Sequence, residues 1–392
     1  MDNLYADRMS KIPRSFVREI LKVADEPDII SFAGGLPNPD TFPQKEFAES
    51  TSFILENSGA EALQYSTTEG YEPLRSLVSE RYAKNGLSVD PENILITNGS
   101  QQGLDLVAKV FLNHEDTVLV EKPTYLAALQ AFGLFEPKFK SIPLLNDGVD
   151  MDVLRSMVEN DDPKLFYSIP NFQNPTGISY SLEKRKLIGE LVNQNETVLV
   201  EDNPYGEIRF MGENLPPIKR FTNNSILLGS FSKVVAPGIR LGWIVAEDET
   251  MHHLVTAKQA SDLHSNFFSQ MIVHHYLTKY DVEDHLTMIR EMYKNQRDFM
   301  LEMIKRYFPE GVKYTEPEGG MFLWVTLPED MDAMELFERT MEDDVAFVPG
   351  EAFYSEDSQK NTLRLNFSNS NNTKIEEGIK KMGKAIKELQ CN

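Results

Sequence analysis

Short apolar runs alternate with helix-like stretches between residues 94 and 246, and this alternation strongly restricts the fold. The runs lie at 94–96, 118–120, 165–167, 198–200, 226–228 and 241–246. A run that is apolar on both faces is typical of a strand covered on both sides, as in a mainly parallel sheet between two layers of helices. The sequence therefore predicts an α/β fold.

Polar clusters follow five of these runs. They occupy 97–103, 121–125, 171–177, 201–205 and 230–240. Parallel strands end at the same edge of a sheet, and ligands gather beyond their carboxyl ends. We therefore expect these five loops to meet at one site, since packing alone explains five converging polar loops poorly.

The last cluster carries the most specific chemistry, because Ser230, Ser232 and Arg240 flank Lys233. Two hydroxyls and a guanidinium can hold a phosphate dianion, and a lysine amine beside them can form a Schiff base. An isolated lysine in such a loop would instead be a solvated residue. The combination is what pyridoxal phosphate (PLP) needs.

A second phosphate contact is predicted where Gly99, Ser100 and Gln101 open a helix after the first apolar run. Backbone N–H groups and the positive end of the helix favour an anion at this position. Ser100 can also be an ordinary N-cap residue, and the two interpretations are compatible.

Together these clusters resemble the pattern of fold-type I PLP enzymes, the aspartate aminotransferase superfamily, over almost the entire chain. Among class I and II aminotransferases, the chain is similar to the branch of 2-aminoadipate and kynurenine aminotransferases, and to the catalytic half of PLP-dependent regulators. The resemblance implies a large domain with a mainly parallel, seven-stranded sheet between helices, and a small α+β domain. It implies an N-terminal segment at 1–45 that joins the small domain, a large PLP-binding domain at 46–284 and a small C-terminal domain at 285–392.

The resemblance also implies roles for five residues around the cofactor ring. Lys233 binds PLP covalently and later acts as the base, and Asp202 pairs with the pyridine nitrogen. Asn174 and Tyr205 bond the ring oxygen, and Tyr125 stacks on the ring. From the residues alone, Asp202 is equally a helix-capping residue, Asn174 an ordinary turn residue and Tyr205 a core tyrosine.

The remaining implied contacts concern the phosphate and the substrate. Gly99, Ser100, Gln101, Ser230, Ser232 and Arg240 form the phosphate cup, which Tyr65 reaches from the partner subunit. Arg364 binds the substrate α-carboxylate, and Gly35 lines the pocket. Arg18, on an expected helix near the substrate side chain, favours donors with a distal carboxylate. From the residues alone, Arg364 could instead lie on the solvent face of a half-buried strand at 362–368. Arg18 could likewise lie on the solvent face of its expected helix.

Composition excludes several other functions. The formal net charge is −22 and the pI is about 4.8, which argues against nucleic acid or an anionic membrane as a partner. Cys391 is the single cysteine, so neither a disulfide framework nor a cysteine metal cluster is expected, and no metal site is predicted. No signal peptide or membrane-spanning run is evident, so we expect a cytoplasmic protein.

Charged residues at 283–298 are expected on a solvated helix face.

The resemblance, together with these observations, implies a homodimeric PLP-dependent aminotransferase that uses an L-amino acid and a 2-oxo acid. 2-Oxoglutarate and glutamate form one expected pair, and the donor is 2-aminoadipate or an aromatic or branched amino acid. A PLP-dependent β-lyase or decarboxylase is the alternative that shares the fold. An effector domain of a PLP-dependent regulator fits less well, because only about 28 residues precede the first expected strand.

Overall fold

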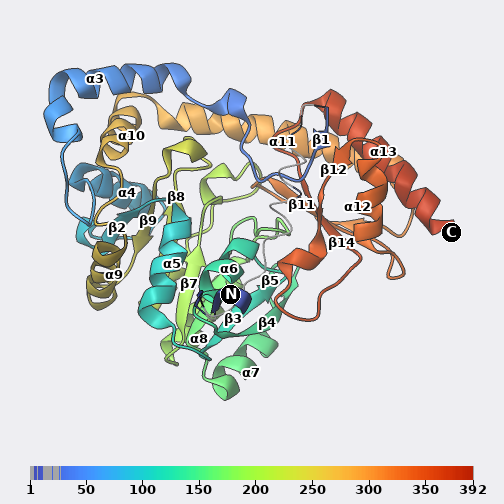
Figure 1. The fold of residues 1–392 in the computed structure, drawn as a ribbon, viewed down its shortest axis with the longest axis horizontal. Helices are drawn as coiled ribbons and strands as arrows, with labels where there is room; N and C mark the ends of the chain where they lie inside the picture. Colours follow the sequence, from blue (N-terminus) through green and yellow to red (C-terminus); the bar gives the residue numbers. More distant parts are fainter. Residues whose placement is uncertain (1–3, 7, 12–19, 21–25, 27, 392) are drawn as a thin grey trace.

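The computed structural model describes residues 4–6, 8–11, 20, 26 and 28–391. Figure 1 shows a large sheet with helices around it and a smaller sheet beside the C-terminal helices. The long helix α11 (Val282–Tyr307) extends along both parts. None of the described helices has the length and apolar character that a membrane crossing requires.

The large sheet has eight strands in the order β2-β9-β8-β7-β6-β3-β4-β5. They are β2 (Ile94–Thr97), β3 (Thr117–Lys122), β4 (Lys138–Leu145), β5 (Gly148–Val149), β6 (Leu165–Ser168), β7 (Val198–Asp202), β8 (Ser225–Ser230) and β9 (Gly242–Val245). Neighbours from β8 to β4 pair in parallel, whereas β9 is antiparallel to both β2 and β8. The predicted mainly parallel sheet is confirmed, and the short strand β5 extends it beyond seven strands.

Helices cover both faces of this sheet because successive side chains of each strand point to opposite sides. Val118 and Val120 belong to the main core, together with apolar residues of α5 (Ser100–Phe111) and α6 (Leu126–Gly133). Leu119, between them, belongs to a second cluster with α7 (Met151–Asp161) and α8 (Leu182–Asn193). This is the physical basis of the runs that are apolar on both faces.

Further helices surround the β2 edge of the sheet (Figure 1). They are α3 (Gln44–Ala62), α4 (Glu72–Lys84), α9 (Asp248–Ser261) and α10 (Phe267–Lys279). Short 3-10 helices lie at Pro39–Thr41, Pro91–Asn93, Gly206–Ile208, Ile218–Phe221, Pro237–Ile239 and Gly350–Phe353, and α1 spans Arg8–Lys11.

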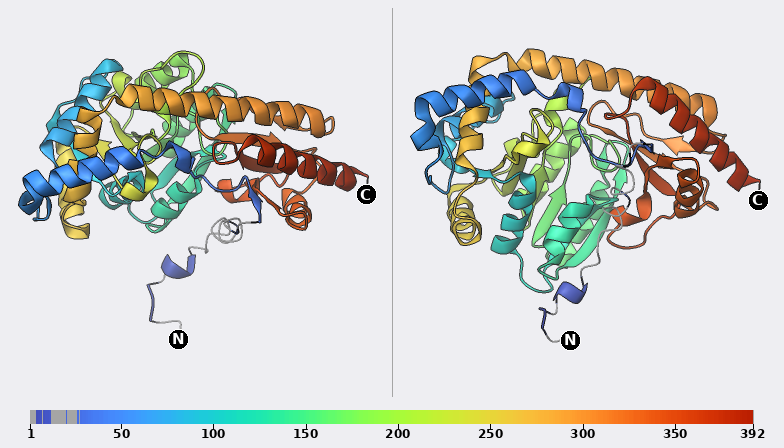
Figure 2. Two further views of the ribbon diagram at one scale, coloured as in Figure 1. Left: turned by 90° about the horizontal axis from the view of Figure 1, so that it is seen from above. Right: turned by 45° about the horizontal axis from the view of Figure 1, so that its top comes forward.

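The smaller sheet is antiparallel, with strand order β10-β11-β14-β13. Its strands are β10 (Lys313–Tyr314), β11 (Phe322–Thr326), β13 (Val348–Pro349) and β14 (Thr362–Asn366), and its helices are α12 (Ala333–Met341) and α13 (Asn372–Gln390). Strand β1 (Ile30–Ser31) pairs in parallel with β12 (Val345–Ala346). In both views of Figure 2, α13 lies along the C-terminal half of α11. Because β1 pairs with β12, a segment near the start of the chain lies against its C-terminal part.

Two predictions about exposure are wrong. Every residue of β14 is buried, including Arg364, because the polar face of the strand meets the loops of the large sheet instead of solvent. Arg297 of α11, expected on a solvated face, is 4% exposed. Its guanidinium donates to the Pro317 carbonyl at 2.9 Å and lies over the Phe210 ring.

Candidate active site

A cavity of about 420 Å³ lies at the carboxyl edge of the large sheet. It is lined by twelve of the predicted site residues: Gly35, Ser100, Gln101, Tyr125, Asn174, Asp202, Tyr205, Ser230, Ser232, Lys233, Arg240 and Arg364. They come from all five polar loops, from the segment that follows β1 and from the small sheet. The expected convergence of these loops is therefore confirmed.

Lys233 follows β8 and presents its amine inside the cavity. Its Nζ donates to the Gly35 carbonyl at 2.8 Å. Desolvation, together with the positive charges of Arg364 and Arg240, lowers the pKa of the Lys233 amine to about 8. The neutral amine, which is the nucleophilic and basic form, is therefore far more populated near neutral pH than in an ordinary lysine, although the protonated form still predominates.

Asp202 is the last residue of β7 and is 1% exposed. The Tyr167 hydroxyl donates to Oδ2 of this carboxylate at 2.9 Å, whereas Oδ1 is buried with no hydrogen-bond partner among the described residues. Burial raises the pKa of Asp202 to about 7, although the bond from Tyr167 opposes this shift. A cationic ring N–H would give Oδ1 its missing partner and favour the ionised carboxylate.

Asn174 connects two other cavity residues. Its Oδ1 accepts from Nη1 of Arg364 at 2.9 Å, and its Nδ2 contacts the Tyr205 hydroxyl at 3.5 Å. Nη2 of Arg364 donates to the Ala33 carbonyl at 2.7 Å, and Nε is buried without a partner among the described residues. Burial lowers the pKa of Arg364 to about 10 and raises that of Tyr205 well above its ordinary value.

Two aromatic rings lie against Arg364, although neither has a predicted role. The guanidinium carbon lies 4.3 Å from the ring centre of Phe322 and 5.0 Å from that of Phe353. Both rings line the cavity. Phe322 is the first residue of β11, and its contact with Arg364 depends on the cross-strand pairing of β11 with β14, which local sequence does not reveal.

The turn before α5 has the geometry of an anion site. Gly99 is the N-cap residue, with φ +77°, so the alternative of Ser100 as the N-cap is wrong. A Cβ atom on Gly99 would lie 2.7 Å from Nη2 of Arg240, so only glycine permits this close approach. Nearby, the Ser232 N–H donates to Oγ of Ser230 at 3.1 Å.

Three predicted residues are not part of the cavity lining: Gly99, which lies directly before Ser100, Tyr65 and Arg18. Tyr65 is 79% exposed and makes an edge contact with the ring of His264 at 5.8 Å. It is outside the cavity lining of its own chain. Arg18 lies outside the described residues.

Glu121, near the end of β3, has no predicted role, yet it anchors the loop that carries Asn174. It is 1% exposed, and its Oε1 accepts from the Tyr180 hydroxyl at 2.7 Å and from Ile169 N at 2.9 Å. Its Oε2 accepts from Nε2 of Gln173 at 2.8 Å. Burial raises the pKa of Glu121 to about 7. A carboxylate that ends an apolar strand is the sequence signal that would have identified it.

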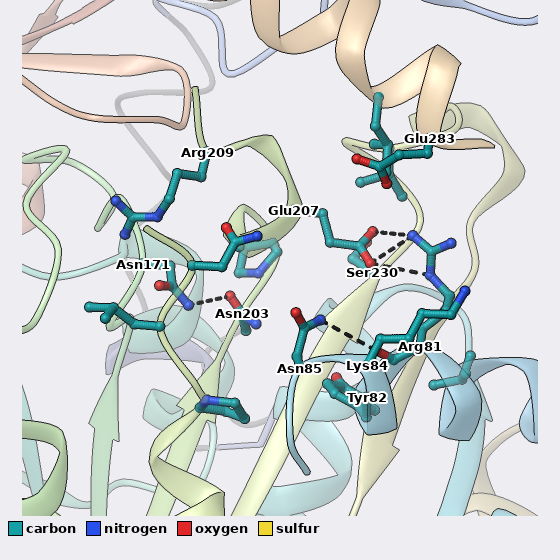
Figure 3. A pocket seen from close by; sticks show the side chains of 18 of the residues that line it. Arg81, Tyr82, Lys84, Asn85, Asn171, Asn203, Glu207, Arg209, Ser230 and Glu283 are labelled. Atoms are coloured by element: carbon teal, nitrogen blue, oxygen red, sulfur yellow. Dashed lines mark hydrogen bonds and ion pairs between the residues drawn. The ribbon is translucent and has the colours of Figure 1, made fainter. Parts of the chain in front are cut away.

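A second cavity, of about 210 Å³, is lined by Asn203, Pro204, Gly206 and Glu207 of the turn that follows β7 (Figure 3). Its wall shares Pro204 and Ser230 with the first cavity. Arg81 of α4 forms a two-pronged ion pair with Glu207 at 2.7 Å, and Arg290 of α11 donates to the Glu207 carbonyl at 2.9 Å. These bonds fix the turn to α4 and α11, and the same turn carries Pro204 and Tyr205, which line the first cavity.

The residues of the first cavity fit PLP. A buried lysine amine can bond the aldehyde, an unpartnered carboxylate oxygen suits a protonated ring nitrogen, and a glycine turn with Arg240 suits a phosphate. This combination on a mainly parallel sheet defines a PLP-dependent enzyme of fold type I.

Comparisons with known proteins agree. The family described as "Aminotransferase class I and II" matches residues 27–382. Aromatic-amino-acid aminotransferase 1 of Thermococcus litoralis is 44% identical, over 99% of this chain and 95% of the relative. The 2-aminoadipate transaminase of Thermus thermophilus is 43% identical, over 97% and 95%. The structure of kynurenine aminotransferase from Pyrococcus horikoshii, in complex with PMP, has a TM-score of 0.95 at 43% identity and covers 99% of this chain and 98% of its own.

The chain belongs to the aminotransferase class I and II family. It is an aminotransferase, and its cofactor is PLP.

Proposed function

We propose that Lys233 is the residue that binds PLP and, once free, moves the proton at the substrate α-carbon. The observation that carries this assignment is the enclosed Nζ with a pKa of about 8, in the same cavity as Arg364. PLP, when bound, supplies an aldehyde that condenses with amines and a ring that accepts electrons from the substrate. Asp202 holds the ring nitrogen, and Asn174 and Tyr205 bond the ring oxygen.

Two further groups position the reactants. Arg364 binds the substrate α-carboxylate with its planar guanidinium, because such a fork matches a carboxylate with two parallel bonds. Gly99, Ser100, Gln101, Ser230, Ser232 and Arg240 hold the phosphate, and Tyr125 covers the ring. Once the substrate amine has displaced Lys233 from the cofactor, the free Nζ of Lys233 acts as the base within the cavity.

Borohydride reduction of the purified enzyme followed by peptide mapping tests the Lys233 assignment. We expect the phosphopyridoxyl group on Lys233 alone. Lys258 is the internal control, because it is also fully buried but lies outside the cavity. Label on any lysine other than Lys233 would contradict the assignment.

We also propose that glutamate and 2-oxoglutarate form one substrate pair and that the other donor is 2-aminoadipate or an aromatic or branched amino acid. The names of the relatives, which specify aromatic amino acids, 2-aminoadipate and kynurenine, support this range. A panel of donors, followed by detection of the keto acid and of pyridoxamine phosphate, tests it. Release of pyruvate and ammonia from cysteine-type donors, without pyridoxamine phosphate, would contradict transamination.

Arg18 remains the proposed determinant of acidic donors. Arg18→Ala should lower kcat/KM for 2-aminoadipate, which corresponds to a loss of transition-state stabilisation on the order of 1.5–3 kcal/mol. The value of kcat/KM for leucine should stay nearly unchanged. Equal losses with both donors would mean that Arg18 positions its helix and does not contact the substrate side chain.

The assembly and the domain limits are proposals as well. We propose a cytoplasmic homodimer with shared active sites, in which Tyr65 reaches the partner's phosphate site. The exposure of Tyr65 supports this placement, because its hydroxyl is available to another chain. We retain 1–45, 46–284 and 285–392 as the proposed divisions of the chain.

A further inference from the structure

Lys258 of α9 is completely buried, although the chemistry proposed above does not use it. Its side chain is 0% exposed, and its Nζ lies 2.8 Å from Oδ1 and 3.0 Å from Oδ2 of Asp262. A buried ammonium group is costly unless it is paired and hydrogen-bonded. The groups that this ion pair contacts therefore indicate what it holds in place.

The ion pair fixes the orientation of one amide. Lys258 Nζ donates to Oε1 of Gln102 at 3.1 Å, and Nε2 of Gln102 donates to Oδ2 of Asp262 at 2.7 Å. Lysine can only donate and an ionised carboxylate can only accept, so the pair determines which end of the amide carries the oxygen. That oxygen also accepts from the backbone N–H of Asn98 at 2.8 Å.

Asn98 is thereby held on both sides. Its Nδ2 donates to Oδ2 of Asp262 at 2.6 Å, and its carbonyl accepts from Nη2 of Arg240 at 3.4 Å. The next residue is Gly99, whose positive φ directs the chain into α5. The first N–H groups of a helix have no acceptor within it, and the first two residues of α5, Ser100 and Gln101, line the cavity.

We propose that Lys258 and Asp262, acting through Gln102, preset the turn at 99–101 for the phosphate group of PLP. They are positioning residues that touch neither cofactor nor substrate. Lys258 has a second effect, because it neutralises the Asp262 carboxylate that would otherwise repel a phosphate dianion. The proposal rests on the assignment of this turn as part of the phosphate site.

The test compares PLP with pyridoxal, which lacks the phosphate. The full-length chain is freed of cofactor, and its affinity for each compound is measured by absorbance titration. In Lys258→Met we expect PLP affinity to fall by about tenfold and pyridoxal affinity to stay within about twofold. Amide hydrogen exchange of a peptide that covers 98–103 should become faster in the same variant.

Two further variants complete the test. Gln102→Leu keeps the Lys258–Asp262 pair and the direct bond from Asn98 Nδ2 to Asp262, but it removes the amide that joins the pair to the Asn98 N–H, so it should show a phosphate-selective loss of the same kind. It decides the question if Lys258→Met does not fold. Lys109→Met is the matched control, because it removes an i, i+4 pair with Asp105 at 2.6 Å on an exposed part of α5. This control should bind both compounds as the wild type does.

The result separates the two assignments. An unchanged PLP affinity, or equal losses of PLP and pyridoxal in both test variants, would overturn the positioning role while leaving the phosphate site intact. A wild-type chain that binds PLP no more tightly than pyridoxal would overturn the phosphate site, and the positioning role with it.

Discussion

The Tyr167 hydroxyl donates to Oδ2 of Asp202 at 2.9 Å and leaves Oδ1 as the one buried oxygen of that carboxylate without a described partner. Tyr167 is itself fully buried at the end of β6, so the bond cannot be replaced by bulk water. It stabilises the ionised carboxylate, which is the form that can hold a protonated ring nitrogen.

The first prediction concerns the pH dependence of cofactor binding in Tyr167→Phe. Loss of a bond to a charged oxygen should raise the pKa of Asp202 above about 7. The acid limb of PLP affinity, measured from pH 5 to 9, should therefore move upward by on the order of one pH unit. A uniform loss of affinity at every pH would show instead that Tyr167 acts through packing.

Tyr180→Phe is the matched control for this experiment. Tyr180 is equally buried and also donates to a buried carboxylate, that of Glu121, at 2.7 Å. Because it makes no bond to Asp202, its removal should leave the acid limb in place.

The second prediction is that Glu121→Gln flattens the pH dependence of stability. The pKa of Glu121 is about 7 in the folded chain against an ordinary 4.5. Between these values the folded state binds more protons than the unfolded state, so the free energy of unfolding falls as the pH rises from 4.5 to 7. Glutamine does not titrate, so this component, on the order of 3 kcal/mol, should be absent.

Denaturant titrations of the PLP-saturated enzyme across this window measure the effect. Asp202 and other groups also titrate there, so the relevant quantity is the difference between wild type and variant. Glu159→Gln removes an exposed carboxylate on α7 and should leave the curve unchanged. A wild-type curve that runs parallel to that of Glu121→Gln would contradict the assignment of this titration.

Much of the site was predictable because it follows from the position of residues at strand ends. Lys233, Asp202 and Asn174 each follow an apolar run, and the parallel arrangement brings such ends to one edge. Neither the strand β4 nor the helix α7 was predicted from the sequence. Charged and half-buried residues of β4 interrupt the apolar pattern that reveals the other strands.

Burial that arises from contacts between distant elements was not predictable. The alternation around Arg364 is the same whether its polar face meets water or another part of the chain, and here it meets the loop of Asn174. Lys258 and Asp262 form an i, i+4 pair that is usual on helix surfaces. Only the packing of α9 against α5 makes the lysine inaccessible.

The third prediction concerns the rings that hold Arg364. Phe353→Leu keeps an apolar side chain but removes the cation–π contact at 5.0 Å. We expect KM for the amino acid to rise by about fivefold, on the order of 1 kcal/mol, with kcat nearly unchanged, because the arginine is less well ordered for the carboxylate. Phe210→Leu removes an equivalent contact with Arg297, also at 5.0 Å, and should leave KM unchanged. A fall in kcat alone would contradict this interpretation of Phe353.

The last prediction concerns the shared active site. Tyr65→Ala and Lys233→Ala chains are co-expressed with different tags, and mixed dimers are purified by both tags. If Tyr65 acts across the interface, one site of the mixed dimer contains intact Lys233 and intact Tyr65, whereas the other site lacks both. Activity should then recover to about half that of a wild-type dimer, because one of two equivalent sites is restored.

The alternative arrangement gives a different result in the same experiment. If Tyr65 serves the site of its own chain, the intact Lys233 always accompanies the altered Tyr65, and no site regains both. The mixed dimer would then show no more activity per intact Lys233 than the Tyr65→Ala homodimer, which serves as the control. The exposed position of Tyr65, outside the cavity lining of its own chain, leads us to expect recovery.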